Sequence, residues 1–274
     1  MARFQPLQDF PRALEHPVGM TRLLRSHRDV LHLQWLAAPE LDSVLLRSRA
    51  PLVFTAHDLL PRRTAARARM WRRLFARFDR IVVHSERGRS ALERFGVDPD
   101  ALRVIPHPVF RSEPGRQDDG ATVLALGVIR PYKGLEDAVA AIGRTPDARL
   151  LVAGDPRIPL DGLVRAAGSQ AEWRLGYLDD LALERALSDA TVAVFPYRDE
   201  LDQSGALLQA LGAGLPAVVY DVGGLGEVVR RFAAGIVVRP GDVDGLAAAL
   251  GTLLGDPAAL ADARAGAEAA RETL

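Results

Sequence analysis

Two basic side chains, Arg130 and Lys133, lie in the turn-forming segment GVIRPYKG at residues 127–134, between an apolar run and a stretch of helical spacing. Lys133 is the single lysine of the chain, because every other member of its 35 lysines and arginines is an arginine. A lysine ammonium is a compact, strongly hydrated point charge, which suits contact with phosphate. We therefore expect Lys133 to bind phosphate. The alternative is that one lysine has persisted by chance on a surface turn.

A second segment has features that suit the same kind of ligand. An apolar run at 191–196 leads into an acidic loop and then to Gln203, Ser204 and Gly205, which open a short helix. Another helix start follows the next apolar run, at Gly223. Unpaired amides and the dipole at a helix N-terminus attract anions. With the two cations, these helix starts predict a diphosphate site that would also offset charge on a departing diphosphate.

These segments need a parallel sheet that brings the carboxyl ends of its strands to one edge. Short apolar, β-branched runs separated by segments of helical spacing are typical of buried parallel strands joined by helices. In the first half of the chain, such runs lie at 29–35, 51–58, 80–85 and 102–106. In the second half, they lie at 122–128, 149–154, 172–177, 191–196, 215–220 and 235–239. The predicted fold class is α/β, with two Rossmann-like doubly wound domains.

A stretch rich in proline, glycine and charge begins at His107 and separates the two halves. It has no apolar periodicity, which favours an interdomain linker. We place the domains at residues 1–108 and 120–274, with the linker at 109–119.

The composition narrows the class of protein. The chain has 274 residues, 48% of them hydrophobic, which is typical of a soluble globular protein. Its 35 acidic and 35 basic residues balance, so no nucleic-acid partner is expected. It has no cysteine, which excludes disulfides and thiolate metal sites, and no apolar stretch approaches the roughly 18 residues of a membrane span. The expected localisation is cytoplasmic.

Residues 62–78 have the spacing of an amphipathic helix. An aromatic stripe on one face is predicted to pack on the sheet. The opposite face is either solvated, or it contacts anionic lipid head groups at a membrane surface or a phosphorylated acceptor. This face carries Arg62, Arg63, Arg67, Arg69, Arg72, Arg73 and Arg77.

The ordered motifs of the second half are LGVIRPYKG, VAGD, FPYRDELDQSGALLQALGAGLPAVV and DVGGLGEVV. They resemble the donor-binding half of the retaining, metal-independent GT-B glycosyltransferases of family 4, the glycosyl transferases group 1. In the first half, DVLHLQW, PLVFTAHDLLP and FDRIVVHSERGRSALERFGVDPDALRVIPHPV are similar to the later strands of that family's acceptor domain. The resemblance implies transfer of a sugar from a UDP- or GDP-linked donor to a glycan, lipid-linked or small-molecule acceptor, with retention and without a cofactor.

The same resemblance implies roles for single residues. The donor phosphate oxygen is thought to take the acceptor proton itself, and Glu200 is expected as the carboxylate near the sugar, the alternative being a solvated loop charge. The chain departs from the family's Glu-x7-Glu pattern at Leu201 and Gln209, although an amide at Gln209 can still hydrogen-bond a hydroxyl. Diphosphate contacts are implied for Arg130, Lys133, Ser204 and Gly205, and sugar or nucleoside contacts for Gln203, Gln209, Gly176 and Tyr177.

Four side chains of the first domain follow or end apolar runs and are expected at the crevice. His84 is implied as a catalytic residue, and His57, His32 and Trp35 as residues on the acceptor side. Each is weighed against a structural role for a hydrogen-bonded core or surface side chain.

Two Asp-x-Asp pairs match a motif of metal-dependent transferases of another fold: Asp98 with Asp100, and Asp242 with Asp244. Each pair precedes a segment of helical spacing, where aspartate is a common N-cap. We therefore predict capping and no metal site.

The first strand and the glycine-rich loop of family members are not recognisable, so the N-terminal domain is expected to be incomplete. It would expose a sheet edge that residues 1–28, a partner, or neither covers. The leading hypothesis is a glycosyltransferase with an intact donor site, and the second is a non-catalytic nucleotide-sugar-binding subunit or degenerate homologue acting with a partner. A sugar-nucleotide epimerase is a distant third, since it should carry more catalytic carboxylates and histidines in the crevice. The base, sugar, acceptor and oligomeric state do not follow from the sequence.

Overall fold

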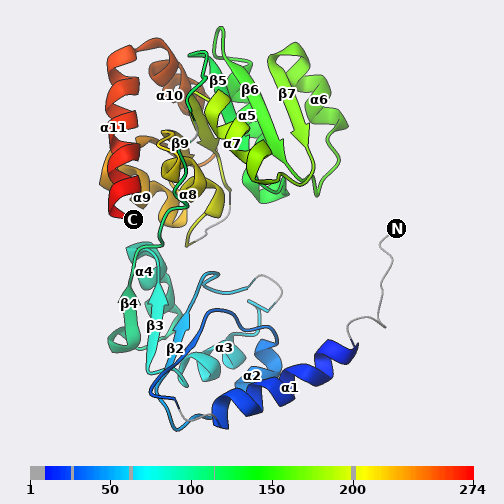
Figure 1. Cartoon of the computed structure of the whole chain (residues 1–274), viewed down its shortest axis with the longest axis vertical. Coiled ribbons are helices and arrows are strands. Elements are labelled where there is room, and N and C mark those ends of the chain that lie inside the picture. The colour runs from blue at the N-terminus through cyan, green and yellow to red at the C-terminus, as the bar shows by residue number, and fades with distance from the viewer. Residues whose placement is uncertain (1–9, 26–27, 62–63, 114, 199–201) are drawn as a thin grey trace. The chain divides into compact units, whose positions relative to one another are not determined.

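The computed structural model of the chain describes residues 10–25, 28–61, 64–113, 115–198 and 202–274. The chain divides into two units, unit 1 up to Pro106 and unit 2 from His107 to Leu274. Each unit contains one parallel sheet accompanied by helices (Figure 1). The predicted α/β class with two Rossmann-like sheets is confirmed.

Unit 1 has a four-stranded sheet in the order β1-β2-β3-β4, with every neighbouring pair parallel. The four predicted strands are present but shorter than their apolar runs, because the last residues of each run leave the ladder and form loops at the carboxyl edge. The strands are β1 (Leu31–Leu33), β2 (Leu52–Thr55), β3 (Arg80–Val83) and β4 (Leu102–Val104). The helices are α1 (Phe10–Arg25), α2 (Pro39–Leu45), α3 (Ala68–Phe75), α4 (Glu86–Phe95) and the 3-10 turn η1 (Pro99–Ala101).

The aromatic stripe packs on the sheet of unit 1, as predicted. Trp71 and Phe75 of α3 are buried, and the Phe75 and Phe78 rings lie 6.4 and 5.1 Å from the ring of Phe54 in β2. The Trp71 indole N–H donates to the Thr64 carbonyl at 3.1 Å, so its one polar atom is satisfied in the core.

Arginines on the other side of this segment contact unit 1 itself. Arg62 and Arg63 lie outside the described residues, and contact of this face with lipid or a phosphorylated acceptor stays a prediction. The contacts are Arg67 with Glu40 (3.0 Å), Arg72 with the Phe95 carbonyl (3.1 Å) and Arg77 with the Leu46 carbonyl (2.8 Å).

Strand β1 forms one edge of this sheet. Among the described residues, β2 is its one strand neighbour. Helix α1 packs against α2, where His16 Nε2 lies 2.7 Å from Oδ1 of the buried Asp42. Coverage of the β1 edge by a partner stays a prediction.

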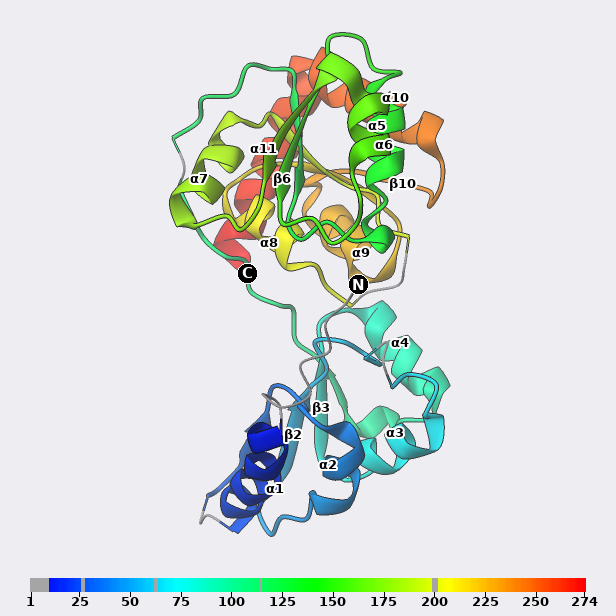
Figure 2. The same ribbon diagram turned by 90° about the vertical axis from the view of Figure 1, so that its right-hand side faces the viewer.

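Unit 2 has a six-stranded parallel sheet in the order β10-β9-β8-β5-β6-β7. Helices α5, α6 and α10 lie on one face and α7, α8 and α11 on the other (Figure 2). The strands are β5 (Thr122–Leu126), β6 (Arg149–Gly154), β7 (Ala171–Leu175), β8 (Val192–Phe195), β9 (Ala217–Tyr220) and β10 (Gly235–Val238). The helices are η2 (Pro131–Lys133), α5 (Leu135–Ile142), α6 (Asp161–Ala167), η3 (Gly168–Gln170), α7 (Asp180–Asp189), α8 (Gly205–Gly212), α9 (Gly223–Phe232), α10 (Val243–Gly255) and α11 (Pro257–Thr273).

The described residues of segment 109–119, which we placed between the domains, lie against unit 2. Val109 belongs to the core of this unit. The backbone N–H of Ser112 donates to the Gly212 carbonyl, and that of Gln117 donates to the Ser188 carbonyl, both at 3.1 Å.

The first aspartate of each Asp-x-Asp pair caps a helical turn, as predicted. Asp98 Oδ1 accepts from the Asp100 N–H at 2.9 Å at the start of η1. Asp242 Oδ1 accepts from the Gly245 N–H at 2.8 Å at the start of α10, and this bond lowers the pKa of Asp242.

In the part of the chain that the structure describes, no single helix has the length and apolar character needed to cross a membrane. Helices α10 and α11 meet those two criteria only as a pair, and they are bent by 97° at the break between them.

The turn before α5 is held close to the end of β8. Gly134 has φ +64°, a conformation that favours glycine, and a β-carbon at this position would overlap the Pro196 carbonyl oxygen. Glycine at 134 therefore lets the β5 loop and the β8 loop approach each other.

We predict that Gly134→Ala destabilises unit 2 by about 2 kcal/mol or more, because it adds backbone strain to a clash with Pro196. The thermal unfolding midpoint should fall by roughly 4–8 °C. Gly162→Ala is the control, since the exposed Gly162 of α6 has open space around its Cα. Equal unfolding midpoints for the two variants would contradict the close approach of Gly134 to the Pro196 carbonyl.

Candidate functional site

Strands β5 and β8 are neighbours at the centre of the sheet of unit 2. The chain leaves β5 toward β6 on one side, and leaves β8 toward β9 on the other. In doubly wound sheets, ligands bind outside the carboxyl ends of the strands at such a reversal of strand order. The loop after β5 carries Arg130 and Lys133, and the loop after β8 carries Gln203 and Ser204. The topology therefore brings the predicted phosphate-binding segments to one crevice.

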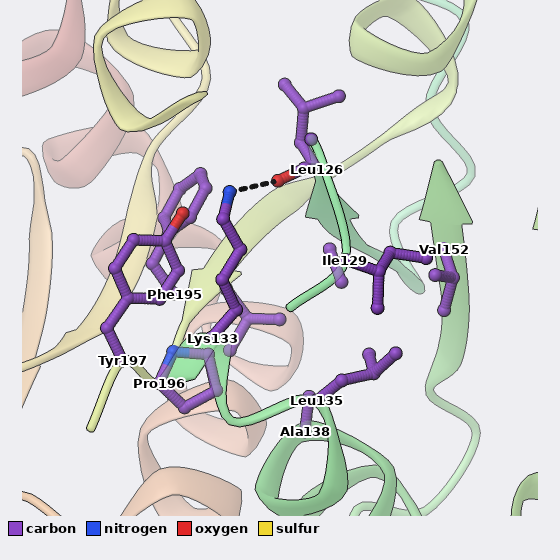
Figure 3. Close-up of a pocket in the computed structure, with 12 residues that line it drawn as sticks. Leu126, Ile129, Lys133, Leu135, Ala138, Val152, Phe195, Pro196 and Tyr197 are labelled. Atoms are coloured by element: carbon purple, nitrogen blue, oxygen red, sulfur yellow. Dashed lines mark hydrogen bonds between the residues drawn. The ribbon is translucent and has the colours of Figure 1, made fainter. Parts of the chain in front are cut away.

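Lys133 ends the turn η2 and is half-buried. Its Nζ lies 3.5 Å from the Leu126 carbonyl oxygen and 5.0 Å from the centre of the Tyr197 ring (Figure 3). It is the one charged side chain among the described residues that line a small, mostly apolar pocket between β5, β8 and α5. Burial lowers the pKa of the Lys133 ammonium below its ordinary value of 10.5.

Arg130 is exposed at the start of η2. Its charge contributes to the lowered pKa of Lys133, so the two cations lie near enough to repel each other. An anion between them would relieve this repulsion, which is the electrostatic property expected of a diphosphate site.

Ser204 is the N-cap of α8, and Gly205 is the first residue of that helix. The Ser204 hydroxyl accepts from the Leu207 N–H at 3.3 Å, and it lies 3.1 Å from the Tyr197 hydroxyl. The cap is buried, and the first turn of α8 leaves backbone N–H groups without partners in the helix. These amides and the dipole of α8 can bind an anion.

The residues predicted to contact sugar and nucleoside lie around the same edge. Gln203 and Gln209 are half-buried, and the buried Oε1 of Gln203 has no hydrogen-bond partner among the described residues. Gly176 follows β7, where its N–H donates to the Gly154 carbonyl at 3.0 Å, and the neighbouring Tyr177 is 91% exposed. Glu200, the predicted sugar-facing carboxylate, lies outside the described residues.

A network that sequence reasoning missed joins the β8 loop to α5. Arg198 pairs with Asp137 at 2.7 Å, and the Tyr220 hydroxyl donates to the same carboxylate at 3.2 Å. The Arg198 backbone N–H donates to the Tyr132 carbonyl at 2.8 Å, within η2. Burial raises the pKa of Tyr220, so this hydroxyl remains a donor. The network ties the loop after β8 to the turn that carries Lys133.

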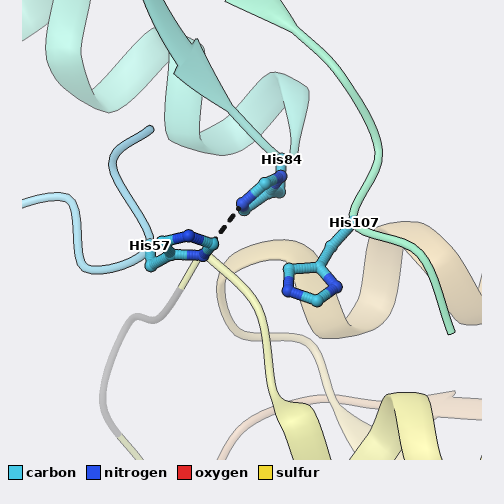
Figure 4. A group of neighbouring side chains, drawn as sticks. All are labelled: His57, His84 and His107. Carbon is cyan, nitrogen blue, oxygen red and sulfur yellow. Dashed lines mark hydrogen bonds between the residues drawn. The ribbon is translucent and has the colours of Figure 1, made fainter. Parts of the chain in front are cut away.

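In unit 1, the predicted histidines form a hydrogen-bonded chain. His84 Nε2 lies 3.3 Å from His57 Nδ1 (Figure 4), and Trp35 stacks on the His57 ring at 4.8 Å. His32 Nε2 lies 2.8 Å from the Thr55 hydroxyl. The structure therefore brings His32, Trp35, His57 and His84 together at the carboxyl edge of β1 to β3. His107, also drawn in Figure 4, belongs to unit 2.

Gln34 completes this chain and was not among the predicted residues. Its amide oxygen lies 3.0 Å from His57 Nε2, and its amide nitrogen lies 3.2 Å from His32 Nε2. Gln34 directly follows β1 and lies two residues after His32, and this spacing of two polar side chains at the end of a strand is the signal that could have identified it.

The partners of His84 constrain the protons in the chain. The Ile105 carbonyl, 2.9 Å from His84 Nδ1, can only accept, so Nδ1 carries a proton. A neutral His84 then accepts at Nε2 from the Nδ1–H of His57. The Gln34 amide lies beside His57 Nε2 and can offer this atom either its donor nitrogen or its acceptor oxygen.

Two parallel α/β units, the first with its four strands in chain order and the second doubly wound, have the architecture of the GT-B class. The family model described as "Glycosyl transferases group 1" matches residues 120–256, and the model "Glycosyltransferase Family 4" matches residues 2–112. The chain belongs to the family 4 (group 1) glycosyl transferases, so the family predicted from its motifs is confirmed.

Related sequences cover the chain in part or nearly whole. The glycogen synthase of Mycobacterium tuberculosis is 38% identical over 162 residues, which are 56% of this chain and 38% of that protein. The D-inositol 3-phosphate glycosyltransferase of Nocardia farcinica is 29% identical over 290 residues, which are 92% of this chain and 64% of that protein. The chain thus spans between about a third and two thirds of these relatives.

Solved structures share the fold. Sucrose-phosphate synthase from Thermosynechococcus elongatus aligns with a TM-score of 0.77 and 23% identity, over 99% of this chain and 74% of that one. Anabaena HepE, solved in complex with UDP and glucose, aligns with a TM-score of 0.77 and 16% identity, over 98% and 78%. These similarities establish the arrangement of strands and helices.

The single lysine permits a direct test of its environment. Reductive methylation with ¹³C-formaldehyde should label only Lys133 and the N-terminal amine, and Lys133→Arg identifies the lysine signal. We predict a titration midpoint in the folded chain below that of the urea-unfolded chain, because desolvation disfavours the ammonium. The unfolded chain then binds this proton more strongly, so the contribution of Lys133 to stability rises with pH between the two midpoints. A Lys133 titration midpoint in the folded chain that equals or exceeds the midpoint in the unfolded chain would contradict burial of the ammonium.

Proposed function

We propose that this protein is a glycosyltransferase that moves a sugar from a nucleoside diphosphate donor to an acceptor hydroxyl. The observation that carries the proposal is the convergence of Arg130, Lys133 and the N-terminus of α8 on the crevice between β5 and β8. Two cations and a helix N-terminus match the charge of a diphosphate. The presence of UDP with the structurally similar HepE, and the names of the curated relatives, support the same ligand class.

In this proposal, unit 2 binds the donor. Arg130, Lys133 and the amides at Ser204 and Gly205 hold the diphosphate. The amide oxygen of Gln203, which has no hydrogen-bond partner among the described residues, accepts from a hydroxyl of the ligand. The other roles follow the sequence expectations. Gln209 contacts sugar or ribose, Glu200 faces the sugar, and the backbone at Gly176 and Tyr177 lies beside the base.

We further propose that transfer retains the anomeric configuration and needs no metal. The bond from the anomeric carbon to the diphosphate oxygen breaks, and the acceptor oxygen bonds to the same face of that carbon. The acceptor proton passes to the departing phosphate oxygen, so no separate base is needed. Arg130, Lys133 and the α8 amides stabilise the negative charge of the leaving diphosphate.

The polar chain of unit 1 is proposed to serve the acceptor. His84 holds the His57 ring through a hydrogen bond, and Trp35 covers one face of that ring. The exposed His32 and Trp35 offer a polar group and an apolar surface, the combination that sugar-like and polyol acceptors need.

Donor binding is tested with a panel of nucleoside diphosphates and nucleotide sugars in thermal unfolding. A matching ligand at about 100 times its Kd should raise the midpoint by roughly 5–10 °C. Lys133→Ala and Arg130→Ala should each weaken binding about 10- to 100-fold, since each removes a charge-assisted contact. Arg165→Ala, which removes an exposed arginine on α6, should bind like the parent. If every ligand of the panel leaves the midpoint unchanged, the donor site is wrong.

Metal independence is tested by transfer assays in EDTA. The expected rate equals the rate without chelator, because protein cations meet the diphosphate charge and the first aspartate of each Asp-x-Asp pair is engaged as a cap. Loss of activity that Mn²⁺ restores would contradict this mechanism. The control is a metal-dependent transferase treated in parallel.

A second candidate function is a nucleotide-sugar-binding subunit without turnover, which the glutamine at position 209 favours. The same panel separates the two candidates. Donor binding with neither transfer to any acceptor nor hydrolysis of the donor would support the subunit, whereas turnover that Lys133→Ala removes supports the transferase.

A further inference from the structure

Tyr197 contacts two of the groups that we propose to hold the diphosphate. Its ring faces the Lys133 ammonium, with Nζ 5.0 Å from the ring centre (Figure 3), and its hydroxyl lies 3.1 Å from Ser204 Oγ. The side chain is 2% exposed. Sequence reasoning assigned Tyr197 no role.

The Tyr197 ring is fixed by other aromatic side chains. Its plane is nearly perpendicular to that of Phe195 at 5.9 Å and to that of Tyr132 at 5.7 Å. Such edge-to-face pairs favour one ring orientation. Since Phe195 belongs to β8 and Tyr132 to η2, the position of Tyr197 is set by both sides of the crevice.

The ring supports a cation in a poorly hydrated place. The pocket beside Lys133 is lined mostly by apolar side chains, and an ammonium in it loses water. An aromatic face attracts a cation and partly replaces that water. Among the described residues, only the Leu126 carbonyl accepts a hydrogen bond from Nζ, which leaves two of its three N–H groups for oxygens of a ligand.

The hydroxyl of Tyr197 can direct the proton of Ser204. Ser204 Oγ already accepts from the Leu207 N–H. Burial raises the pKa of Tyr197, so its phenol keeps its proton and can donate to the remaining lone pair of Ser204. With both acceptor positions occupied, the Ser204 O–H is left to donate to an anionic oxygen.

We propose that Tyr197 is a positioning residue of the donor site, whose ring holds Lys133 and whose hydroxyl orients Ser204 toward the same diphosphate. The inference rests on the proposed function and extends it by adding a residue between two of the phosphate contacts. Tyr197 acts through Lys133 and Ser204, and it needs no contact with the donor itself.

The ring is tested without any ligand. In the ¹³C-methylated chain, the Lys133 methyl signals should be shifted upfield, because they lie over an aromatic face. Tyr197→Phe should keep this shift, and Tyr197→Leu should move the signals to their positions in the urea-unfolded chain. Unshifted signals in the folded parent, or an unchanged shift in Tyr197→Leu, would overturn the role of the ring.

The hydroxyl is tested by calorimetric titration of unmethylated protein with the nucleoside diphosphate that binds most tightly in the panel. Tyr197→Phe should weaken binding about 3- to 10-fold, the effect of one neutral hydrogen bond. In a Ser204→Ala background, the same substitution should have no further effect, because the hydroxyl acts through Ser204. Thr145→Val is the matched control, since it removes a buried hydroxyl that donates to the Ala141 carbonyl at 3.0 Å. It should lower the unfolding midpoint and leave affinity unchanged.

Three outcomes are distinguishable. Parent-like affinity in Tyr197→Phe, or additive effects with Ser204→Ala, would overturn the inference while donor binding stands. Failure of the parent chain to bind any nucleoside diphosphate would instead remove the proposed function, and the diphosphate role of Tyr197 with it. Weaker binding in Tyr197→Phe that disappears in the Ser204→Ala background supports the inference.

Discussion

Strands β5 and β8 lie side by side in unit 2 although β6 and β7 separate them in the chain. Their following segments diverge, which leaves room above the sheet, while glycine at 134 lets the two loops approach at the base of that space. The rest of the site depends on this geometry. Lys133, Tyr197 and the start of α8 come from distant parts of the sequence, and they meet because the sheet brings the two strand ends together.

Local signals in the sequence predicted much of this arrangement. Apolar β-branched runs placed all ten strands that the structure describes, because buried parallel strands are marked by composition over a few residues. Asp98 and Asp242 were recognised as caps for a similar reason, since the acceptor and the N–H it bonds are two or three residues apart. Lys133, the single lysine, was predicted to bind phosphate, and it lies beside the end of β5.

Contacts between segments distant in the sequence could not be read in the same way. Tyr197 followed an apolar run and gave no sign that its ring would face Lys133, 64 positions earlier in the numbering. Gln34 was not predicted, because its contacts with His32 and His57 form only when the ends of two strands meet. Arginines expected on a solvated or lipid-facing surface, such as Arg72 and Arg77, also bond to carbonyls of neighbouring elements.

The segment that precedes β5 determines where the chain can be cut into fragments that fold separately. The Phe110 carbonyl occupies the space where any side chain at Gly212 would lie, and the Gly212 carbonyl in turn accepts from Ser112. These two backbone contacts hold the segment before β5 against the end of α8. A fragment that begins at residue 120, where the regular alternation of strands and helices starts, would lack these contacts. It would also expose apolar surface that Val109 covers. The boundary for isolating unit 2 therefore lies ahead of His107.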